Sequence, residues 1–185
     1  PQDEPVRVGA TEDWLTLIVG AWTIHLRLQT EGRFPDVASV VPDSKAVSTR
    51  LNLDEADAAF LAKAVNRLPA ADDVFSPITL DLNGQVLVRA TADDQPHPTE
   101  LLLTNSDITG SPLRLNTDRT YLRRAVQLGF RQACFSGPET PVLCEDARRR
   151  YVWMVLGKEG AVERSDDATR IASPIAASTT RSRPQ

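Results

Sequence analysis

The sequence predicts an α+β fold built from a β-α-β-β-β unit that occurs twice. Three observations predict it: short runs in which apolar and polar residues alternate, two segments with apolar residues at helical spacing, and the recurrence of these elements in the same order. Alternation is typical of strands with one buried face, and the helical spacing is typical of an amphipathic helix. Each copy alone has too small a sheet and too short a helix to be stable, so we expect the two copies to share one core.

The first copy begins with a short strand over residues 47–51. Asp54 follows as the expected N-cap of a helix that ends before Pro69. Two alternating runs then flank Asn83-Gly84, which is the strongest short signal for a β-hairpin, and a third strand follows over 101–103. The apolar residues at helical spacing are Phe60, Leu61, Ala64, Val65 and Leu68.

The second copy repeats this order. An entry strand over 113–115 leads to a helix that we expect Asn116 or Thr117 to cap. A hairpin with its turn at 137–140 follows, and the last strand covers 151–156. The apolar residues of this helix are Tyr121, Leu122, Ala125, Val126 and Leu128.

Only part of a further unit lies upstream of the doubled one. Alternating apolar residues predict a hairpin over 15–28, and no helix precedes it. We therefore divide the chain into residues 1–42, the end of a preceding domain with a connector, and residues 43–157, a complete domain. The connector, Glu31–Pro42, is expected to turn at Gly32 and to be stiffened by Pro35 and Pro42, because proline fixes φ. Residues 158–185 are polar and small, which predicts a disordered tail.

Composition and motifs argue against several classes of function. A net charge of −4 disfavours a surface coated with basic residues for nucleic acid, although it allows a local basic stripe. Cys134 and Cys144 are too few for a disulfide framework or a zinc site, so we expect free buried thiols. Neither His25 nor His97 has a second ligand at metal spacing or a nucleophile beside it. We expect no cofactor, no metal and no catalytic residue, hence a protein that is not an enzyme.

The chain also has no run that is long and apolar enough to cross a membrane, and no signal peptide opens it. These features favour a cytoplasmic protein without a membrane partner.

The ordered set of motifs resembles the bacterial sliding clamp, the beta subunit of DNA polymerase III, from about Trp14 to Leu156. The motifs are Glu31-Gly-Arg-Phe-Pro-Asp36, Phe75-Ser-Pro-Ile-Thr-Leu-Asp-Leu-Asn-Gly84, Leu113-Arg-Leu-Asn116, Pro141-Val-Leu-Cys-Glu-Asp146 and Tyr151-Val-Trp-Met154. The resemblance implies the DNA-clamp fold, with residues 1–42 as the end of the clamp's middle domain and residues 43–157 as its C-terminal domain. The family's first domain and the first half of its second have no counterpart here, and Val155 stands where the family has Pro.

The resemblance also implies a pocket for short linear peptides between the middle and C-terminal domains. An adaptable apolar groove with one amide to hold the peptide backbone suits such a ligand. The matching positions are Pro35, Ser39, Val40, Phe75, Asn116, Tyr121, Glu139, Pro141, Met154, Val155 and Leu156. The alternative is that Phe75, Tyr121 and Met154 are ordinary core residues.

In clamps the helices line the hole of the ring and face the DNA backbone. Sequence-independent attraction to phosphates needs only basic side chains on that face. The matching residues here are Lys63, Arg67, Arg119, Arg123, Arg124 and Gln127. The alternative is a solvated charged face, which the acidic residues at the start of the first helix favour.

The resemblance implies a processivity factor of DNA replication without catalytic activity. Its expected partners are duplex DNA, a DNA polymerase, the clamp loader and repair proteins, and the full-length protein is expected to form a homo-oligomeric ring. One alternative is a clamp-derived interaction module that binds peptides without encircling DNA. Another is a structural domain that is similar to clamps in fold only.

Overall fold

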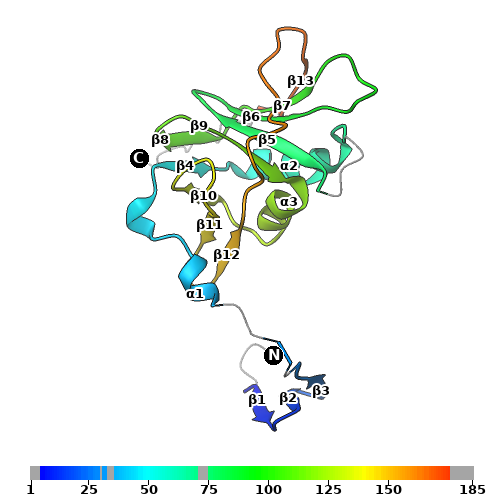
Figure 1. Ribbon diagram of the computed structural model, residues 1–185, viewed down its shortest axis with the longest axis vertical. Helices are drawn as coiled ribbons and strands as arrows, with labels where there is room; N and C mark the ends of the chain where they lie inside the picture. Colours follow the sequence, from blue (N-terminus) through cyan, green and yellow to red (C-terminus); the bar gives the residue numbers. More distant parts are fainter. Residues whose placement is uncertain (1–4, 30, 33–35, 71–74, 176–185) are drawn as a thin grey trace, which may run out of the picture. The chain divides into compact units, whose positions relative to one another are not determined.

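A computed structural model describes residues 5–29, 31–32, 36–70 and 75–175 (Figure 1). The chain divides into two units, residues 1–39 and 40–185. The boundary falls inside α1 (Val37–Val40).

The first unit is a three-stranded antiparallel sheet of β1 (Arg7–Ala10), β2 (Trp14–Val19) and β3 (Trp22–Arg27). Gly20 turns the chain between β2 and β3 with φ of 56°, a conformation in which glycine is favoured. This hairpin is the one that the alternating apolar residues predicted. Its side chains include the exposed Trp22 and Ile24, so the described part of this unit has no enclosed core.

The second unit contains the doubled β-α-β-β-β pattern. A short 3₁₀ helix, η1 (Ser44–Ala46), precedes it. The first copy consists of β4 (Thr49–Asn52), α2 (Glu55–Ala64) with its 3₁₀ extension η2 (Val65–Arg67), β5 (Pro77–Leu82), β6 (Val86–Ala90) and β7 (Thr99–Leu103). The second copy consists of β9 (Leu113–Asp118), α3 (Arg119–Gln127), β10 (Gln132–Phe135), β11 (Val142–Glu145) and β12 (Arg150–Trp153). Two further strands, β8 (Asp107–Gly110) and β13 (Thr169–Ala172), stand outside the copies.

The two copies exchange their first strands. The first sheet has the order β12-β11-β10-β4-β8, so β4 of the first copy pairs with β10 of the second. The second sheet has the order β13-β7-β6-β5-β9, so β9 of the second copy pairs with β5 of the first. Each sheet therefore needs strands from both copies, which explains physically why neither copy is complete alone.

One hydrophobic core joins the two sheets and the two helices. The helices α2 and α3 pack against each other (Figure 1). Leu61 of α2 and Leu122 of α3 are buried in it, together with Leu51 of the first sheet and Leu80 of the second. Burial of a Leu side chain stabilises a fold by about 1.5–3 kcal/mol, so these contacts supply the main driving force for the shared core.

Aspartates cap both helices. Asp54 accepts a hydrogen bond at 2.8 Å from a backbone N–H two residues further on, as the sequence predicted. The predicted caps of α3, Asn116 and Thr117, are wrong, because both residues remain in β9 and pair with β5. Asp118 is the cap, and its carboxylate accepts from the backbone N–H of Thr120 at 2.7 Å.

The guanidinium group of Arg119 is buried and lies among backbone carbonyls. Its Nη1 donates to the carbonyl of Leu68 at 2.7 Å, and its Nη2 donates to that of Pro69 at 2.6 Å. Its Nε donates to the carbonyl of Ser76 at 2.8 Å. Burial lowers the pKa of Arg119, while the charge of Asp118 opposes this shift. The prediction that Arg119 faces DNA is therefore wrong: this side chain joins the end of η2 to the start of β5.

The segment after residue 157 is folded as far as the structure describes it. The expectation of a disordered tail is wrong for residues 158–175, since β13 pairs in parallel with β7. All four side chains of β13 are exposed, so the strand has no buried stripe that a sequence pattern could reveal. Residues 176–185 lie outside the described residues.

Both cysteines are free and buried, as expected. Burial raises the pKa of Cys144 to about 12, and the neighbouring Cys134 adds to this shift. Burial also raises the pKa of Cys134, although Arg50 partly opposes the change. Since the thiolate is the reactive form of cysteine, both groups are protected in the folded protein.

We expect Arg119→Ala to lower the free energy of unfolding by about 3 kcal/mol, because it leaves several buried carbonyls without their donor. Urea denaturation followed by circular dichroism measures this loss. The matched control is Arg124→Ala on the same helix, whose side chain is exposed and whose loss should change stability by less than about 0.5 kcal/mol. Equal effects of the two substitutions would contradict the structural role of Arg119.

We expect neither thiol to react with Ellman's reagent in the folded protein at pH 8. With a pKa of about 12, Cys144 has a thiolate fraction on the order of 10⁻⁴ at that pH. Unfolding in urea returns the pKa to about 8.5 and should release both thiols for rapid reaction. A Cys134→Ser variant isolates the signal of Cys144, and rapid labelling of this folded variant would refute the assignment.

Candidate functional site

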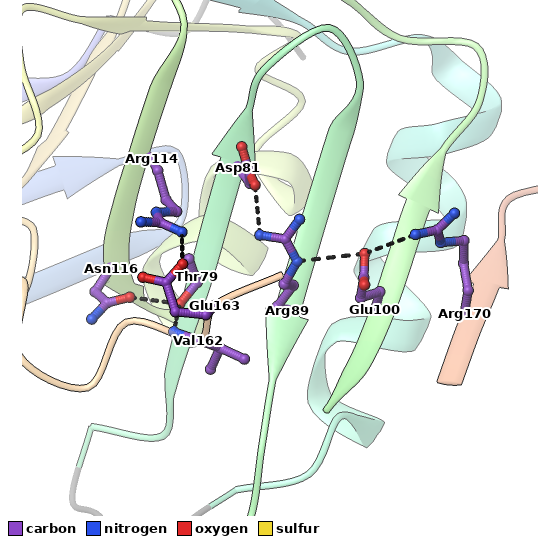
Figure 2. Close-up of polar contacts among 9 residues, drawn as sticks. All are labelled: Thr79, Asp81, Arg89, Glu100, Arg114, Asn116, Val162, Glu163 and Arg170. Carbon is purple, nitrogen blue, oxygen red and sulfur yellow. Dashed lines mark hydrogen bonds and ion pairs between the residues drawn. The ribbon is translucent and has the colours of Figure 1, made fainter. Parts of the chain in front are cut away.

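A row of polar side chains crosses the outer face of the second sheet, with one residue from each strand (Figure 2). The strand register places them opposite one another in the order Asn116, Thr79, Arg89, Glu100 and Arg170. We call these five residues the polar row. Because successive side chains of a strand point to opposite faces, the row lies on the face opposite to the core residues Leu80, Val88 and Leu101.

Charges alternate in sign along part of this face. Nη1 of Arg89 lies 2.5 Å from Oδ2 of Asp81, and its Nε lies 3.4 Å from Oε2 of Glu100. Nη2 of Arg170 lies 3.6 Å from the same oxygen of Glu100 (Figure 2). Arg89 and Glu100 are both completely buried. The two cations balance the two carboxylates, as buried charges require, and the loss of one partner leaves an uncompensated charge.

A segment that we call the strap, residues 157–168, covers part of this face. The backbone N–H of Val162 donates to Oγ1 of Thr79 at 2.8 Å, and this hydroxyl donates to Oδ1 of Asn116 at 2.7 Å. Arg114 and Glu163 form an ion pair between β9 and the strap (Figure 2). Nδ2 of Asn116 donates to the carbonyl of Gly157 at 3.1 Å. The strap is therefore attached to the sheet by specific polar contacts.

A cavity of about 370 Å³ lies between the strap and β5. Three residues of the predicted peptide pocket line it together, namely Phe75, Asn116 and Leu156. The backbone N–H of Leu156 donates to the carbonyl of Asn116 at 2.9 Å, which places the end of the second copy against β9. The side chain of Phe75 is about half exposed at 52%, so it belongs to a surface rather than to the core.

The other residues of the predicted pocket do not line this cavity. Tyr121 and Met154 are exposed, which argues against their being core residues. Val155, by contrast, is buried in the core and presents no side chain to a ligand. Glu139 forms an ion pair with Lys158 of the strap, with 3.3 Å between Oε1 and Nζ.

The remaining residues of the predicted peptide pocket come from other parts of the chain. Pro141 is half-buried just before β11. Ser39 and Val40 are exposed on α1, where the chain passes between the two units, and Pro35 lies outside the described residues.

The predicted DNA-facing residues fall into two groups. Lys63, Arg67, Arg124 and Gln127 are exposed. Arg119 is buried, as described above, and Arg123 is half-buried with its Nε donating to the carbonyl of Ala62 on the neighbouring helix at 3.3 Å. Basic charge is thus available on both helices, but from fewer residues than the sequence predicted.

Sequence reasoning missed the polar row and the strap. One signal for the row was available, because Arg89 and Glu100 each stand within or beside a run of apolar residues in a strand. Charges in such positions are rarely buried without partners. The strap carried no comparable signal, since its composition is polar and its contacts with Thr79 and Asn116 are made largely through its backbone.

Two kinds of feature are absent from the described part of the chain. It contains no group of three or more His, Cys, Asp or Glu residues that could hold a metal ion. Among the same residues, no helix has the length and apolar character needed to span a membrane.

Solved structures of bacterial sliding clamps match this chain, whereas no protein-family model and no curated protein does. The DNA polymerase III subunit beta of Pseudomonas aeruginosa matches with a TM-score of 0.67 and 22% identity, over 85% of this chain and 43% of that one. The pol III beta of Caulobacter crescentus matches with a TM-score of 0.62 and 23% identity, over 82% of this chain and 41% of the other. The beta chain from Streptococcus pneumoniae has a TM-score of 0.64 and 16% identity, over 82% and 41%.

The match covers most of this chain but less than half the length of each clamp. The tandem β-α-β-β-β unit and the clamp fold that the sequence predicted agree with this match. This chain therefore has the α+β fold of the bacterial sliding clamps.

Proposed function

We propose that this chain is part of a sliding-clamp-type processivity factor, which tethers a DNA polymerase and other proteins to duplex DNA. The observation that carries the proposal is a clamp fold in which Phe75, Asn116 and Leu156 line one cavity. Clamp-loader and repair proteins are further proposed partners, through short linear peptides. The chain spans about 43% of a clamp, so the encircling ring belongs to a larger assembly in this proposal.

The chemistry of the cavity supports a peptide ligand. Phe75 and Leu156 supply apolar surface, and the amide of Asn116 already holds a backbone carbonyl of the strap, that of Gly157. A side-chain amide that binds one extended backbone suits another, because backbone carbonyls present the same acceptor in every sequence. The exposed Met154 adds an adaptable apolar side chain outside the cavity.

Basic residues on the helices support an electrostatic attraction to DNA. Lys63 and Arg67 on the α2–η2 segment and Arg124 on α3 are exposed and free to attract phosphates. Such contacts are independent of sequence and weaken as salt rises, as sliding along DNA requires.

A specific observation favours a second candidate function, an interaction module that binds peptides without encircling DNA. Arg119 is buried and Arg123 is half-buried, so the helices present less basic charge than the sequence predicted for a DNA-facing surface. In this alternative the cavity retains its role, and the helices carry only a solvated charged surface.

Titration of a fluorescent clamp-binding peptide should give saturable binding that Phe75→Ala and Met154→Ala each weaken about tenfold, since each removes apolar contact with the ligand. Fluorescence anisotropy measures the Kd. Ile175→Ala is the matched control, because it truncates an exposed apolar side chain outside the cavity and should leave the Kd unchanged. If the unmodified protein shows no saturable binding of the peptide, both candidate functions are wrong.

Binding to a random-sequence duplex at low salt separates the two candidates. The double variant Lys63→Glu/Arg124→Glu should bind DNA at least about tenfold more weakly than the unmodified chain. The slope of log K against log[salt] should become shallower by about 2, which is about 1 for each lost phosphate contact. The control Arg148→Glu/Arg164→Glu changes the net charge equally at exposed positions off the helices. If both double variants lose the same affinity, only net charge matters and the helices do not face DNA.

A further inference from the structure

The buried amide of Asn116 has both of its hydrogen-bond donors occupied by the strap. The Nδ2 group of an asparagine carries two donors. Here one donates to the carbonyl of Gly157 at 3.1 Å and the other to the carbonyl of Glu159 at 3.4 Å. Oδ1 of Asn116 accepts from the hydroxyl of Thr79 at 2.7 Å, which fixes the orientation of the amide (Figure 2). The carbonyl of a bound peptide can therefore reach this amide only after a carbonyl of the strap has left it.

A tight turn brings the strap back onto the polar side chains of the sheet. Gly160 has φ of 81°, a conformation in which glycine is favoured, and the N–H of Ala161 closes the turn by donating to the carbonyl of Lys158 at 3.1 Å. The N–H of Val162 then donates to the hydroxyl of Thr79 at 2.8 Å (Figure 2). The strap thus offers the sheet backbone carbonyl and N–H groups, which are the groups that every extended peptide offers.

The strap also takes up room beside the sheet that a peptide needs. The cavity between the strap and β5 has a volume of about 370 Å³. Ligand pockets span about 300–1,000 Å³, so this cavity is small for an extended segment. The strap supplies part of the lining, through Gly157, Glu159, Gly160 and Val162. Movement of the strap away from β5 would therefore widen the cavity as well as release the amide.

The contacts that hold the strap are weak. None of its residues is buried, and the half-buried ones are Ala161, Val162, Ser165 and Ala168. Its two ion pairs, Arg114 with Glu163 and Lys158 with Glu139, join exposed side chains. Such pairs add little stability, because water screens their charges. Segments with few buried apolar contacts open locally at a lower free energy than the core does.

We propose that the strap is an autoinhibitory segment, and that a partner peptide enters the cavity after the strap has moved off Asn116. This inference rests on the proposed function of the cavity as a peptide site. The strap follows β12 directly and ends at β13, which pairs with β7, so it opens as a loop held at both ends. A tethered competitor acts at a high effective concentration. The apparent affinity for the peptide is then reduced to the fraction of chains in which the strap is open.

Reversal of charge at both ion pairs should open the strap without a change in the cavity. In Lys158→Glu/Glu163→Arg each new side chain meets a like charge, neither substituted residue lines the cavity, and the net charge of the chain is unchanged. The fluorescent clamp-binding peptide should bind this variant at least about tenfold more tightly than it binds the unmodified chain, as measured by anisotropy. The control Lys45→Glu/Glu12→Arg makes the same replacements at exposed positions outside the strap and should leave the Kd unchanged.

Hydrogen exchange of the unmodified chain, followed by NMR, distinguishes a displaced strap from a fixed wall of the cavity. Bound peptide should speed up the exchange of the N–H of Val162, because this group loses its acceptor on Thr79 when the strap moves away. A fixed wall would instead be protected by the peptide. The N–H of Leu156, which donates to the carbonyl of Asn116 just before the strap, is the internal control and should not exchange faster.

Two results would overturn the autoinhibitory role, and they can be told apart. If the peptide binds both chains with the same Kd and slows the exchange of Val162, the strap is a fixed wall, whereas the proposed function of the cavity stands. If neither the unmodified chain nor the charge-reversed variant binds the peptide, the cavity is no peptide site and both proposals are wrong.

Discussion

The exchange of first strands between the two copies is the constraint on which the rest of the second unit depends. β4 lies beside β10 and β9 lies beside β5, so each sheet is completed only when the other copy is in place. Residues 49–52 must find residues 132–135, which makes this pairing strongly non-local. Non-local pairing requires a large loss of chain entropy before the stabilising contacts form. We therefore regard folding of this unit as a single cooperative event. Both helices and both sheets also share a single hydrophobic core, so each copy depends on the other for the burial of its apolar side chains.

Buried polar groups fix the alignment of this shared core. Arg119 joins the end of η2 to the start of β5 through carbonyl groups, and Asp57 joins α2 to the residues that follow β7. Trp153 reaches from β12 in the first sheet to Thr117 in the second through a buried hydrogen bond of 2.8 Å. Such hydrogen bonds add less stability than apolar burial does. An alternative packing that left one of these buried polar groups without a partner would, however, cost considerable free energy. They therefore select one register among the several that apolar packing alone would allow.

One continuous segment contacts both the candidate cavity and the edge of the second sheet. It leaves β12, crosses Asn116 as the strap and ends at β13 beside Glu100 (Figure 2). The match covers less than half the length of the solved clamp. The fold of this chain alone therefore does not establish the function of a whole clamp. In this chain the C-terminal part covers part of the outer face and the edge of the second sheet. The charged residues Arg89 and Glu100 on that face are completely buried.

The doubled unit, the helix cap at Asp54 and the hairpin at Asn83-Gly84 could be predicted from the sequence, because they depend on periodicity and on local backbone chemistry. The resemblance to sliding clamps grouped Phe75, Asn116 and Leu156 in one predicted pocket, and these three residues line one cavity. The burial of Arg119, the position of Val155 in the core and the pairing of β13 with the second sheet could be learned only from the folded structure. In each case the deciding partner is distant in the chain or is a backbone group. Arg119 binds carbonyls some 50 residues away, as at Leu68, and β13 is held largely through its backbone. Backbone groups are the same for every residue type, so no sequence pattern records such contacts.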